Sequence, residues 1–351
     1  MSEKKYLTRT GDGSIVYMTE AEIRDDISAG IEDAVKRGKV PPLNEDDIEK
    51  LVEIITMPGV IVGVEHGKQV VSTSDSGSDK ISHVCGVPMD RCIQTEVFEK
   101  AFGADSVDIG YPDYSYKAVK PVAYMESLVM QNAQERNVMP ILYGAMPNLG
   151  LYTKPDGPVD NWAELLPLGK IEEAYKAQED AVEMAVKDMV YVADYMYEAG
   201  ADGLNMDTCG AAGDADLLAG LKACEEIREK YPDLGVEMGM AAEFVLGMHG
   251  KLEYKGERLA GMYPHKQVKI CEKAGATIFG GVVNTNTSRS FPWNIARVCT
   301  FMKECSAVAE IPIHANVGMG VCGIPMTETA SSDVVSRVDK ALIEICNLDG
   351  L

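Results

Sequence analysis

The sequence has few basic residues, few aromatic residues and no long apolar run. Its 351 residues include 33 Lys and Arg against 55 Asp and Glu, which gives a formal net charge of −22. Such a negative chain repels phosphate backbones and anionic lipid, so nucleic acids and membranes are poor partners, whereas protonated amines suit it. No stretch approaches the ~20 apolar residues that cross a bilayer, and residues 1–13 lack the apolar core of a signal peptide. We therefore expect a cytoplasmic protein.

Motifs of several large enzyme classes are also missing. No GxGxxG follows an expected strand, and there is no Walker loop, no GxSxG nucleophile elbow and no HExxH zinc motif. These absences count against a dinucleotide-binding fold, a P-loop nucleotidase, a serine hydrolase and a zinc protease. The 9 cysteines form no CxxC pair, so we expect reduced, buried thiols and no metal site.

The chain divides into an N-terminal α+β appendage, residues 1–92, and a larger catalytic domain, residues 93–351. The division rests on a change of pattern near residue 93, where helical and strand-like segments begin to alternate. Within the appendage, residues 72–80 are rich in Ser, Gly and Asp and predict a flexible loop.

The start of the appendage carries clear turn and helix signals. Strand-like residues 6–10 and 14–18 flank a Gly-Asp-Gly turn and predict a hairpin. Thr19 stands three residues before Glu22, which is capping-box spacing, and opens a helix to about residue 36. Asn44 is expected to cap a second helix.

The catalytic domain reads as alternating strands and helices, which predicts a parallel sheet with right-handed crossovers. Strands are expected at residues 106–110, 138–143, 203–206, 235–240, 277–283 and 311–315. Helices are expected at residues 122–136, 171–199, 214–231, 264–273, 292–308 and 331–346. Recurrent helix–Ala-Gly-Ala–strand junctions favour a (β/α)8 TIM barrel, α/β in class, over an open doubly wound sheet.

The barrel is expected to be incomplete. A barrel needs eight strands to close, and this sequence supplies about six and the start of a seventh, at residues 348–351. Ending there would leave unpaired strand edges, so we expect that the remainder of the barrel is missing after Leu351.

Barrel active sites form where strands end, and these positions hold carboxylates, amides and one histidine. Carboxylates can bind an ammonium group or move protons, and amides can orient a substrate. The expected catalytic residues are Asp207, Glu237, Asn284 and His314. The expected substrate-binding residues are Tyr111, Tyr143, Asn205, Asn286 and Asn316.

For each of these positions a structural role is an open alternative. An Asp or Asn after a strand often caps the next helix, which could be the whole role of Asp207 or Asn286, and Asp214 is expected to cap its helix. His314 could be a satisfied core residue, and the tyrosines could serve in packing. Glu243 and His249 lie in an expected loop and could be solvated.

Long segments throughout the chain resemble the dimethylamine corrinoid methyltransferases. The similar strings cover residues 11–19 (GDGSIVYMT), 101–122 (AFGADSVDIGYPDYSYKAVKPV), 143–158 (YGAMPNLGLYTKPDGP), 200–216 (GADGLNMDTCGAAGDAD), 241–250 (AAEFVLGMHG), 284–288 (NTNTS) and 318–329. The monomethylamine and trimethylamine enzymes share the chemistry, but these strings are similar to the dimethylamine type.

This resemblance implies a methyl transfer from dimethylamine to cobalt(I) of a separate corrinoid protein, in methylamine metabolism and methanogenesis. It also implies a homo-oligomer with no directly bound cofactor, whose reactive group is pyrrolysine, encoded by an amber codon. In the family pyrrolysine follows a segment similar to the one that ends at Leu351, so we expect this chain to lack it and to be inactive by itself. From strand-end position we assign Asp207 and Glu237 to proton handling or ammonium binding, and Asn284 and His314 to orientation.

Two alternatives remain at this point. The chain could be a pyrrolysine-free, corrinoid-dependent barrel methyltransferase, or a fragment that binds the corrinoid partner without catalysing a reaction.

Overall fold

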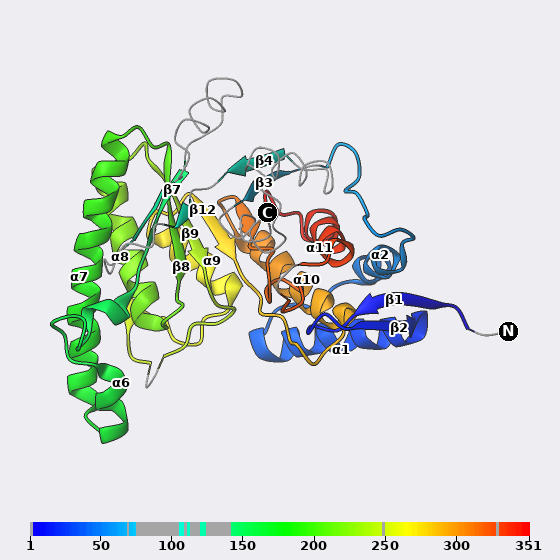
Figure 1. Cartoon of the computed structure of the whole chain (residues 1–351), viewed down its shortest axis with the longest axis horizontal. Helices are drawn as coiled ribbons and strands as arrows, with labels where there is room; N and C mark the ends of the chain where they lie inside the picture. The colour runs from blue at the N-terminus through cyan, green and yellow to red at the C-terminus, as the bar shows by residue number, and fades with distance from the viewer. Residues whose placement is uncertain are drawn as a thin grey trace, which may run out of the picture. The chain divides into compact units, whose positions relative to one another are not determined.

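A computed structural model describes residues 3–68, 70–74, 105–108, 111–112, 120–123, 142–247, 250–327 and 330–351 (Figure 1). The chain divides into two compact units. Unit 1 comprises Met1–Asp108, Pro264–Val268 and Gly281–Leu351. Unit 2 comprises Ile109–Tyr263 and Lys269–Gly280. The boundary predicted at residues 92–93 lies outside the described residues.

The predicted N-terminal hairpin and its two helices are confirmed. Strands β1 (Lys5–Arg9) and β2 (Ile15–Thr19) pair antiparallel. Helix α1 (Glu20–Gly38) begins at a full capping box, in which the Thr19 side chain accepts from the backbone of Glu22 and the Glu22 side chain accepts in return. Helix α2 (Glu45–Thr56) begins in the same way at Asn44. Local sequence alone explains both starts, because each box satisfies orphan backbone donors.

Unit 1 packs these N-terminal helices against helices from the C-terminal end of the sequence. Helix α1 contacts α10 (Phe291–Val308), and α2 contacts α11 (Ser332–Glu344). Figure 1 shows α1 beside α10. At the crossing, a Cβ on Gly30 would lie 2.3 Å from the carbonyl oxygen of Trp293, so only glycine permits this approach. Arg9 adds an ion pair to Asp333 of α11, with Nε 3.0 Å from Oδ2.

Unit 1 also contains one pair of short strands and one isolated β-bridge. Strand β3 (Val71–Ser74) pairs in parallel with β4 (Asp105–Asp108). Strand β13 (Ile313–Ala315) forms a parallel bridge from His314 to Gly350. The strand onset predicted at residues 348–351 is thus supported by backbone pairing.

Unit 2 contains a mixed sheet whose strands β7, β8, β9 and β12 run parallel and lie side by side in chain order. These are β7 (Leu142–Met146), β8 (Gly203–Cys209), β9 (Gly235–Met240) and β12 (Ile278–Gly281). Two further strands, β5 (Tyr111–Pro112) and β6 (Lys120–Ala123), extend the sheet antiparallel beside β7. The α/β class is confirmed, and four of the predicted strands pair in parallel. The strand predicted at residues 106–110 was expected to begin this parallel sheet, but β4 pairs with β3, and antiparallel strands lie beside β7.

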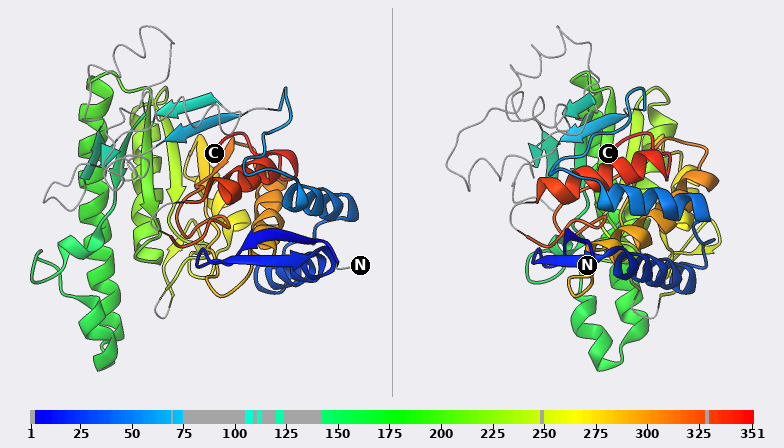
Figure 2. Two further views of the ribbon diagram at one scale, coloured as in Figure 1. Left: turned by 45° about the vertical axis from the view of Figure 1, so that its right-hand side comes forward. Right: turned by 90° about the vertical axis from the view of Figure 1, so that its right-hand side faces the viewer.

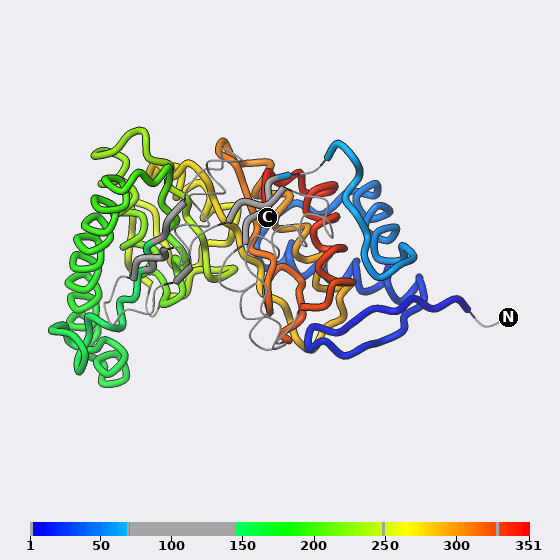
Figure 3. Tube along the Cα trace, turned by 45° about the horizontal axis from the view of Figure 1, so that its top comes forward, coloured from blue at the N-terminus to red at the C-terminus, as the bar shows by residue number. Residues whose placement is uncertain are grey.

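Helices connect the parallel strands of unit 2. They are α7 (Ile171–Glu198), α8 (Asp214–Lys230) and α9 (Pro264–Lys273), within a residue or two of prediction. Helix α7 packs along α8, as Figure 2 shows. Figure 3 shows the long helix α7 in green along the Cα trace. Short elements fill the connections: η1 (Leu149–Tyr152), α6 (Trp162–Leu165), η2 (Leu166–Leu168), β10 (Glu253–Tyr254) and β11 (Glu257–Arg258).

Two predictions are wrong at their edges. Residues 72–74, predicted as loop, belong to strand β3; a Ser-rich composition outweighed the β-branched Val71 and Thr73 that favour a strand. Residues 122–123, predicted to begin a helix, belong to strand β6, since pairing with β7 overrides local propensity. The rest of that predicted helix lies outside the described residues.

Among the described helices, none combines the length and the hydropathy that crossing a bilayer requires.

Candidate active site

Three of the predicted site residues gather on one face of the unit 2 sheet. Asn205 is in register with Glu237 on the neighbouring strand, and Asp207 lies two residues further along β8. Alternation along a strand places residues 205 and 207 on one face. Met238 and Cys209 lie on the opposite face of the sheet, because their side chains lie next to Gly220 of helix α8. We name Asn205, Asp207 and Glu237 the β8–β9 cluster, which therefore faces away from α8.

The β8–β9 cluster is polar yet largely buried. Asn205 is 8% exposed and Glu237 3% exposed, while Asp207 is half-buried. The Oδ1 atom of Asn205 has no hydrogen-bond partner among the described residues. A buried acceptor without a partner costs about 1–3 kcal/mol, so its retention points to a role other than stability.

Gly239 of strand β9 lies close to the β8–β9 cluster. A Cβ at this position would lie 3.1 Å from Asn205 Oδ1 and 3.4 Å from Asp207 Oδ1. The first of these contacts is tight, so the lack of a side chain at Gly239 lets the two polar side chains pack against this strand.

The backbone is strained next to Asp207. Thr208 has a φ of 56°, which a β-branched residue rarely adopts. The pairing register of β8 with β9 also shifts between Met206 and Cys209. The Thr208 N–H donates to Asp207 Oδ1 over 2.8 Å, which holds the carboxylate at the strand end. Strain of this kind, together with a register shift, is typical of functional sites.

The loop between β8 and α8 adds a buried carboxyl group that the sequence analysis missed. Asp216, in the first turn of α8, is 1% exposed, and its Oδ2 accepts from the Ala212 N–H over 3.3 Å. Burial raises the pKa of Asp216 to about 7, although backbone hydrogen bonds from the loop oppose the rise. Its Oδ1 has no partner among the described residues. The only sequence signal was a second acid, two residues after Asp214, in the string GDAD.

Asp214 does not cap α8 as predicted. The residue that precedes the helix is Gly213, whose φ of 105° and close approach to Leu246 exclude a side chain, so Asp214 is the first helical residue. Its N–H donates to the Leu246 carbonyl oxygen over 2.7 Å, and burial raises the pKa of its carboxyl. This contact packs residues 241–247 against the β8–α8 loop. Glu243 is buried there, and His249 lies outside the described residues.

The remaining predicted residues of unit 1 are more exposed. Asn284 and Asn316 are exposed, and His314 is half-buried. Backbone hydrogen bonds draw their loops together, with Asn316 N donating to Gly281 O over 3.2 Å and Thr285 N donating to Gly320 O over 2.9 Å. Backbone hydrogen bonds within unit 1 thus join the loops that carry Asn284 and Asn316, but the side chains of these two residues lie at the surface.

Asn286 has a structural role in its loop. Its Oδ1 accepts from the Ser288 backbone over 3.0 Å and from the Ser288 hydroxyl over 2.8 Å. The buried Asn294 completes the arrangement, because its Oδ1 accepts from Asn286 N over 2.7 Å and its Nδ2 donates to three carbonyl oxygens, among them that of Asn286. Asn286 therefore has a structural role but does not cap the next helix, because the N-cap of α10 is Ser290, whose side chain accepts from the Trp293 N–H.

The two predicted tyrosines are described in their backbone only. Tyr111 begins β5, and Tyr143 lies in β7. Pairing sets Tyr143 beside Leu204, and Gly144 beside Asn205. The residue that neighbours the β8–β9 cluster in β7 is therefore a glycine.

Two further features of the described residues bear on the chemistry. No group of three or more His, Cys, Asp or Glu is arranged to hold a metal ion within the described ranges. Burial raises the pKa values of the Cys209, Cys271 and Cys346 thiols well above normal, which keeps them protonated and unreactive.

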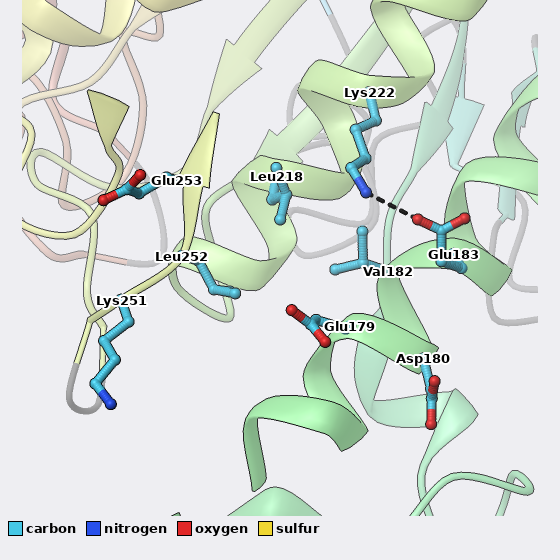
Figure 4. A pocket seen from close by; sticks show the side chains of 9 residues that line it. All are labelled: Glu179, Asp180, Val182, Glu183, Leu218, Lys222, Lys251, Leu252 and Glu253. Carbon is cyan, nitrogen blue, oxygen red and sulfur yellow. Dashed lines mark hydrogen bonds and ion pairs between the residues drawn. The ribbon is translucent and has the colours of Figure 1, made fainter. Parts of the chain in front are cut away.

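A surface hollow lies apart from the β8–β9 cluster, between α7 and α8 of unit 2 (Figure 4). It has a volume of about 480 Å³, and Lys222 pairs with Glu183 at its wall over 2.8 Å. Its other lining residues are Glu179, Asp180, Val182, Leu218, Lys251, Leu252 and Glu253. None of the predicted site residues lines it.

Parallel strands joined by helices, with buried carboxylate and amide groups on two neighbouring strands, define a protein of the α/β class. The model of the dimethylamine methyltransferase (Dimeth_PyL) family matches residues 4–351, and the chain belongs to this family. The resemblance found in the sequence strings is thereby confirmed. No solved structure matches the chain.

Proposed function

We propose that this protein transfers a methyl group from dimethylamine to the cobalt of a corrinoid protein. The family match over residues 4–351 carries the methyltransferase assignment. The corrinoid acceptor rests on the resemblance stated from the sequence. The atoms balance without another reactant: dimethylammonium loses a methyl cation to cobalt(I), and neutral monomethylamine leaves.

In this proposal the β8–β9 cluster binds the ammonium form of the substrate. Asp207 supplies a carboxyl group on β8, and Glu237 supplies a second carboxyl on the neighbouring strand β9. A carboxylate and a cation in a partly buried site attract each other more strongly than in water. Keeping the nitrogen positively charged makes the amine the better leaving group, since it then departs without a negative charge.

We further propose that the parallel sheet belongs to a (β/α)8 barrel. The support is the order of β7, β8, β9 and β12, which follows the chain without the reversal found in doubly wound sheets. In a barrel the polar residues at the ends of these strands would face the mouth.

The experiment is a methyl-transfer assay with the purified protein, dimethylamine and a reduced corrinoid protein. Formation of one monomethylamine for each cobalt methylated supports the proposal. Folded protein that methylates no cobalt from dimethylamine would refute it. Binding of the corrinoid protein without turnover would identify the non-catalytic alternative.

The Glu237→Gln variant tests the site, with Glu229→Gln as its matched control. The control makes the same Glu-to-Gln substitution at an exposed residue. Glu229 lies at the C-terminal end of α8, far along the helix from the β8–α8 loop. Loss of activity in the first variant and full activity in the second assigns the chemistry to the β8–β9 cluster.

A further inference from the structure

The buried carboxyl group of Asp216 receives its hydrogen bonds from the backbone of the β8–α8 loop. Asp216 is 1% exposed, and its Oδ2 accepts from the Ala212 N–H over 3.3 Å. The N–H groups of Ala211 and Gly210 also interact with this carboxyl. Three consecutive backbone N–H groups directed at one carboxyl favour its negative form, as they do in anion-binding loops.

Two opposing influences bring the ionisation of Asp216 into the neutral range. Burial raises its pKa to about 7, and the N–H groups of the loop oppose that rise. Its Oδ1 has no hydrogen-bond partner among the described residues. The charge on Asp216 therefore changes near pH 7, and the loop backbone is the group that senses the change.

Other titratable side chains lie near Asp216. Cys209, at the end of β8, interacts with it, but burial raises the pKa of this thiol well above normal and keeps it protonated. Asp214 belongs to the same turn of α8, Asp207 lies on β8, and Glu243 lies in the segment that packs on the loop. A variant that removes only the charge of Asp216 separates its titration from theirs.

A path of backbone hydrogen bonds joins the β8–α8 loop to the β8–β9 cluster. The Ala211 N–H donates to the Thr208 carbonyl oxygen over 3.1 Å, and the Thr208 N–H donates to Asp207 Oδ1 over 2.8 Å. Thr208 has a φ of 56°, which a β-branched residue keeps only where its surroundings hold it. A loop that opens therefore frees Thr208 to leave this conformation, and the hydrogen bond to Asp207 is then lost.

We propose that Asp216 is a positioning residue whose charge sets how firmly the β8–α8 loop holds Thr208 and, through it, the carboxyl group of Asp207. The ionised form attracts the loop N–H groups more strongly than the neutral form does, because charge-assisted hydrogen bonds are the stronger ones. The loop opens less often when Asp216 is charged. The inference rests on the proposed function for the role of Asp207, whereas the response of the loop does not depend on it.

Local and global stability are expected to change in opposite directions with pH. Since the pKa of Asp216 is raised in the folded protein, the free energy of unfolding decreases as the pH rises through 7. The loop, in contrast, should become harder to open over the same interval. A carboxyl that served only the overall stability of the fold would move both quantities in the same direction.

The experiment is hydrogen–deuterium exchange of the purified protein at pH 6 and pH 8, with rates corrected for the intrinsic effect of pH. We expect the protection of a peptide that covers residues 208–213 to rise at least about fivefold from pH 6 to pH 8. Asp216→Asn should abolish this rise, because the amide has a similar shape and stays neutral at both pH values.

Asp214→Asn is the matched control in the same turn of α8. The carboxyl of Asp214 lies toward Gly247, where an added Cβ would come within 2.6 Å of its Oδ2. The control should therefore keep the rise in protection of residues 208–213. Protection that is equal at the two pH values, that falls as the pH rises, or that still rises in Asp216→Asn would overturn the inference.

The pH profile of methyl transfer links the loop to the site. If the loop positions Asp207, the wild-type rate should rise at least about threefold more from pH 6 to pH 8 than the rate of Asp216→Asn. Parallel profiles of the two proteins would refute the positioning role. Loop protection that responds to Asp216 in a protein without methyl transfer would refute the proposed function and keep the response of the loop.

Discussion

Unit 1 and unit 2 differ in the burial and hydrogen bonding of the polar residues predicted for the site. In unit 2, Asn205 and Glu237 are buried, and the acceptor of Asn205 has no described partner. In unit 1, Asn286 is exposed, and its side chain is engaged within its own loop. An unused buried acceptor costs stability, whereas a satisfied surface amide contributes to it. The comparison shows that the side chain of Asn286 serves its own loop, whereas the buried acceptor of Asn205 has no such structural role among the described residues.

The largest effect is expected where a buried carboxyl of unit 2 is neutralised. Glu237→Gln should lower the rate of methyl transfer about 100-fold or more, the size expected when a proton-handling or charge-binding group is lost. Steady-state assays beside Glu229→Gln measure it. If the variant keeps activity within threefold of the wild type, the β8–β9 cluster does not take part in methyl transfer through Glu237.

A large loss of stability, without loss of binding, is expected in unit 1. Asn294→Ala removes a buried side chain that accepts from Asn286 N and donates to three carbonyl oxygens. The free energy of unfolding should fall by about 2–3 kcal/mol, because buried polar groups are left unpaired. Urea unfolding gives this value, and calorimetry should show unchanged dimethylammonium affinity. A weakened affinity in a folded variant would give unit 1 a direct part in binding.

A gain of stability that depends on pH is expected when Asp216 is replaced by Asn. Burial raises its pKa to about 7 in the folded protein, against about 3.9 in the unfolded chain. Between these values the folded form holds the extra proton, so the stability contributed by this carboxyl is present at low pH and is lost as the pH rises through 7. Asp216→Asn stays neutral, and it should raise the free energy of unfolding by about 1–2 kcal/mol at pH 8.5 and by less at pH 5.

Urea unfolding at the two pH values measures this difference, and Asp156→Asn, on an exposed carboxyl, serves as the control. An equal effect of Asp216→Asn at both pH values would show that Asp216 does not titrate between them.

The smallest effect is expected at the surface of unit 1. Asn316→Ala changes an exposed side chain, so the free energy of unfolding should move by less than about 0.5 kcal/mol. Dimethylammonium affinity should stay within threefold of the wild type. A larger loss of affinity would support the substrate-binding role that was predicted for Asn316 from its place after a strand.

Much of the fold could be predicted from local sequence. The capping residues Thr19 and Asn44 fixed the starts of α1 and α2, and apolar periodicity gave α7, α8, α9 and β9 nearly to the residue. The missed elements depend on pairing between distant residues. Strand β3 pairs with β4 about thirty positions away, and β6 pairs with β7, neither of which local composition reveals.

The kind of residue in the candidate site could be predicted from the sequence, but its exact members could not. The rule that polar residues near strand ends form the site selected Asn205, Asp207 and Glu237, all of which lie within strands β8 and β9. The same rule could not separate them from Asn286, whose partner Ser288 was not recognised. It also missed Asp216, because a pKa raised by burial exists only in the folded chain.

The sequence by itself determined the family, the α/β class and the polar residues of the parallel strands, because these depend on composition, periodicity and long matching strings. Only the tertiary structure decided which of those residues lie together. Register places Asn205 beside Glu237, Gly239 lies close to the side-chain oxygens of Asn205 and Asp207, and burial leaves the oxygen of Asn205 without a described partner. Each of these properties depends on the distance between atoms on neighbouring strands, and the order of residues along one strand does not contain it.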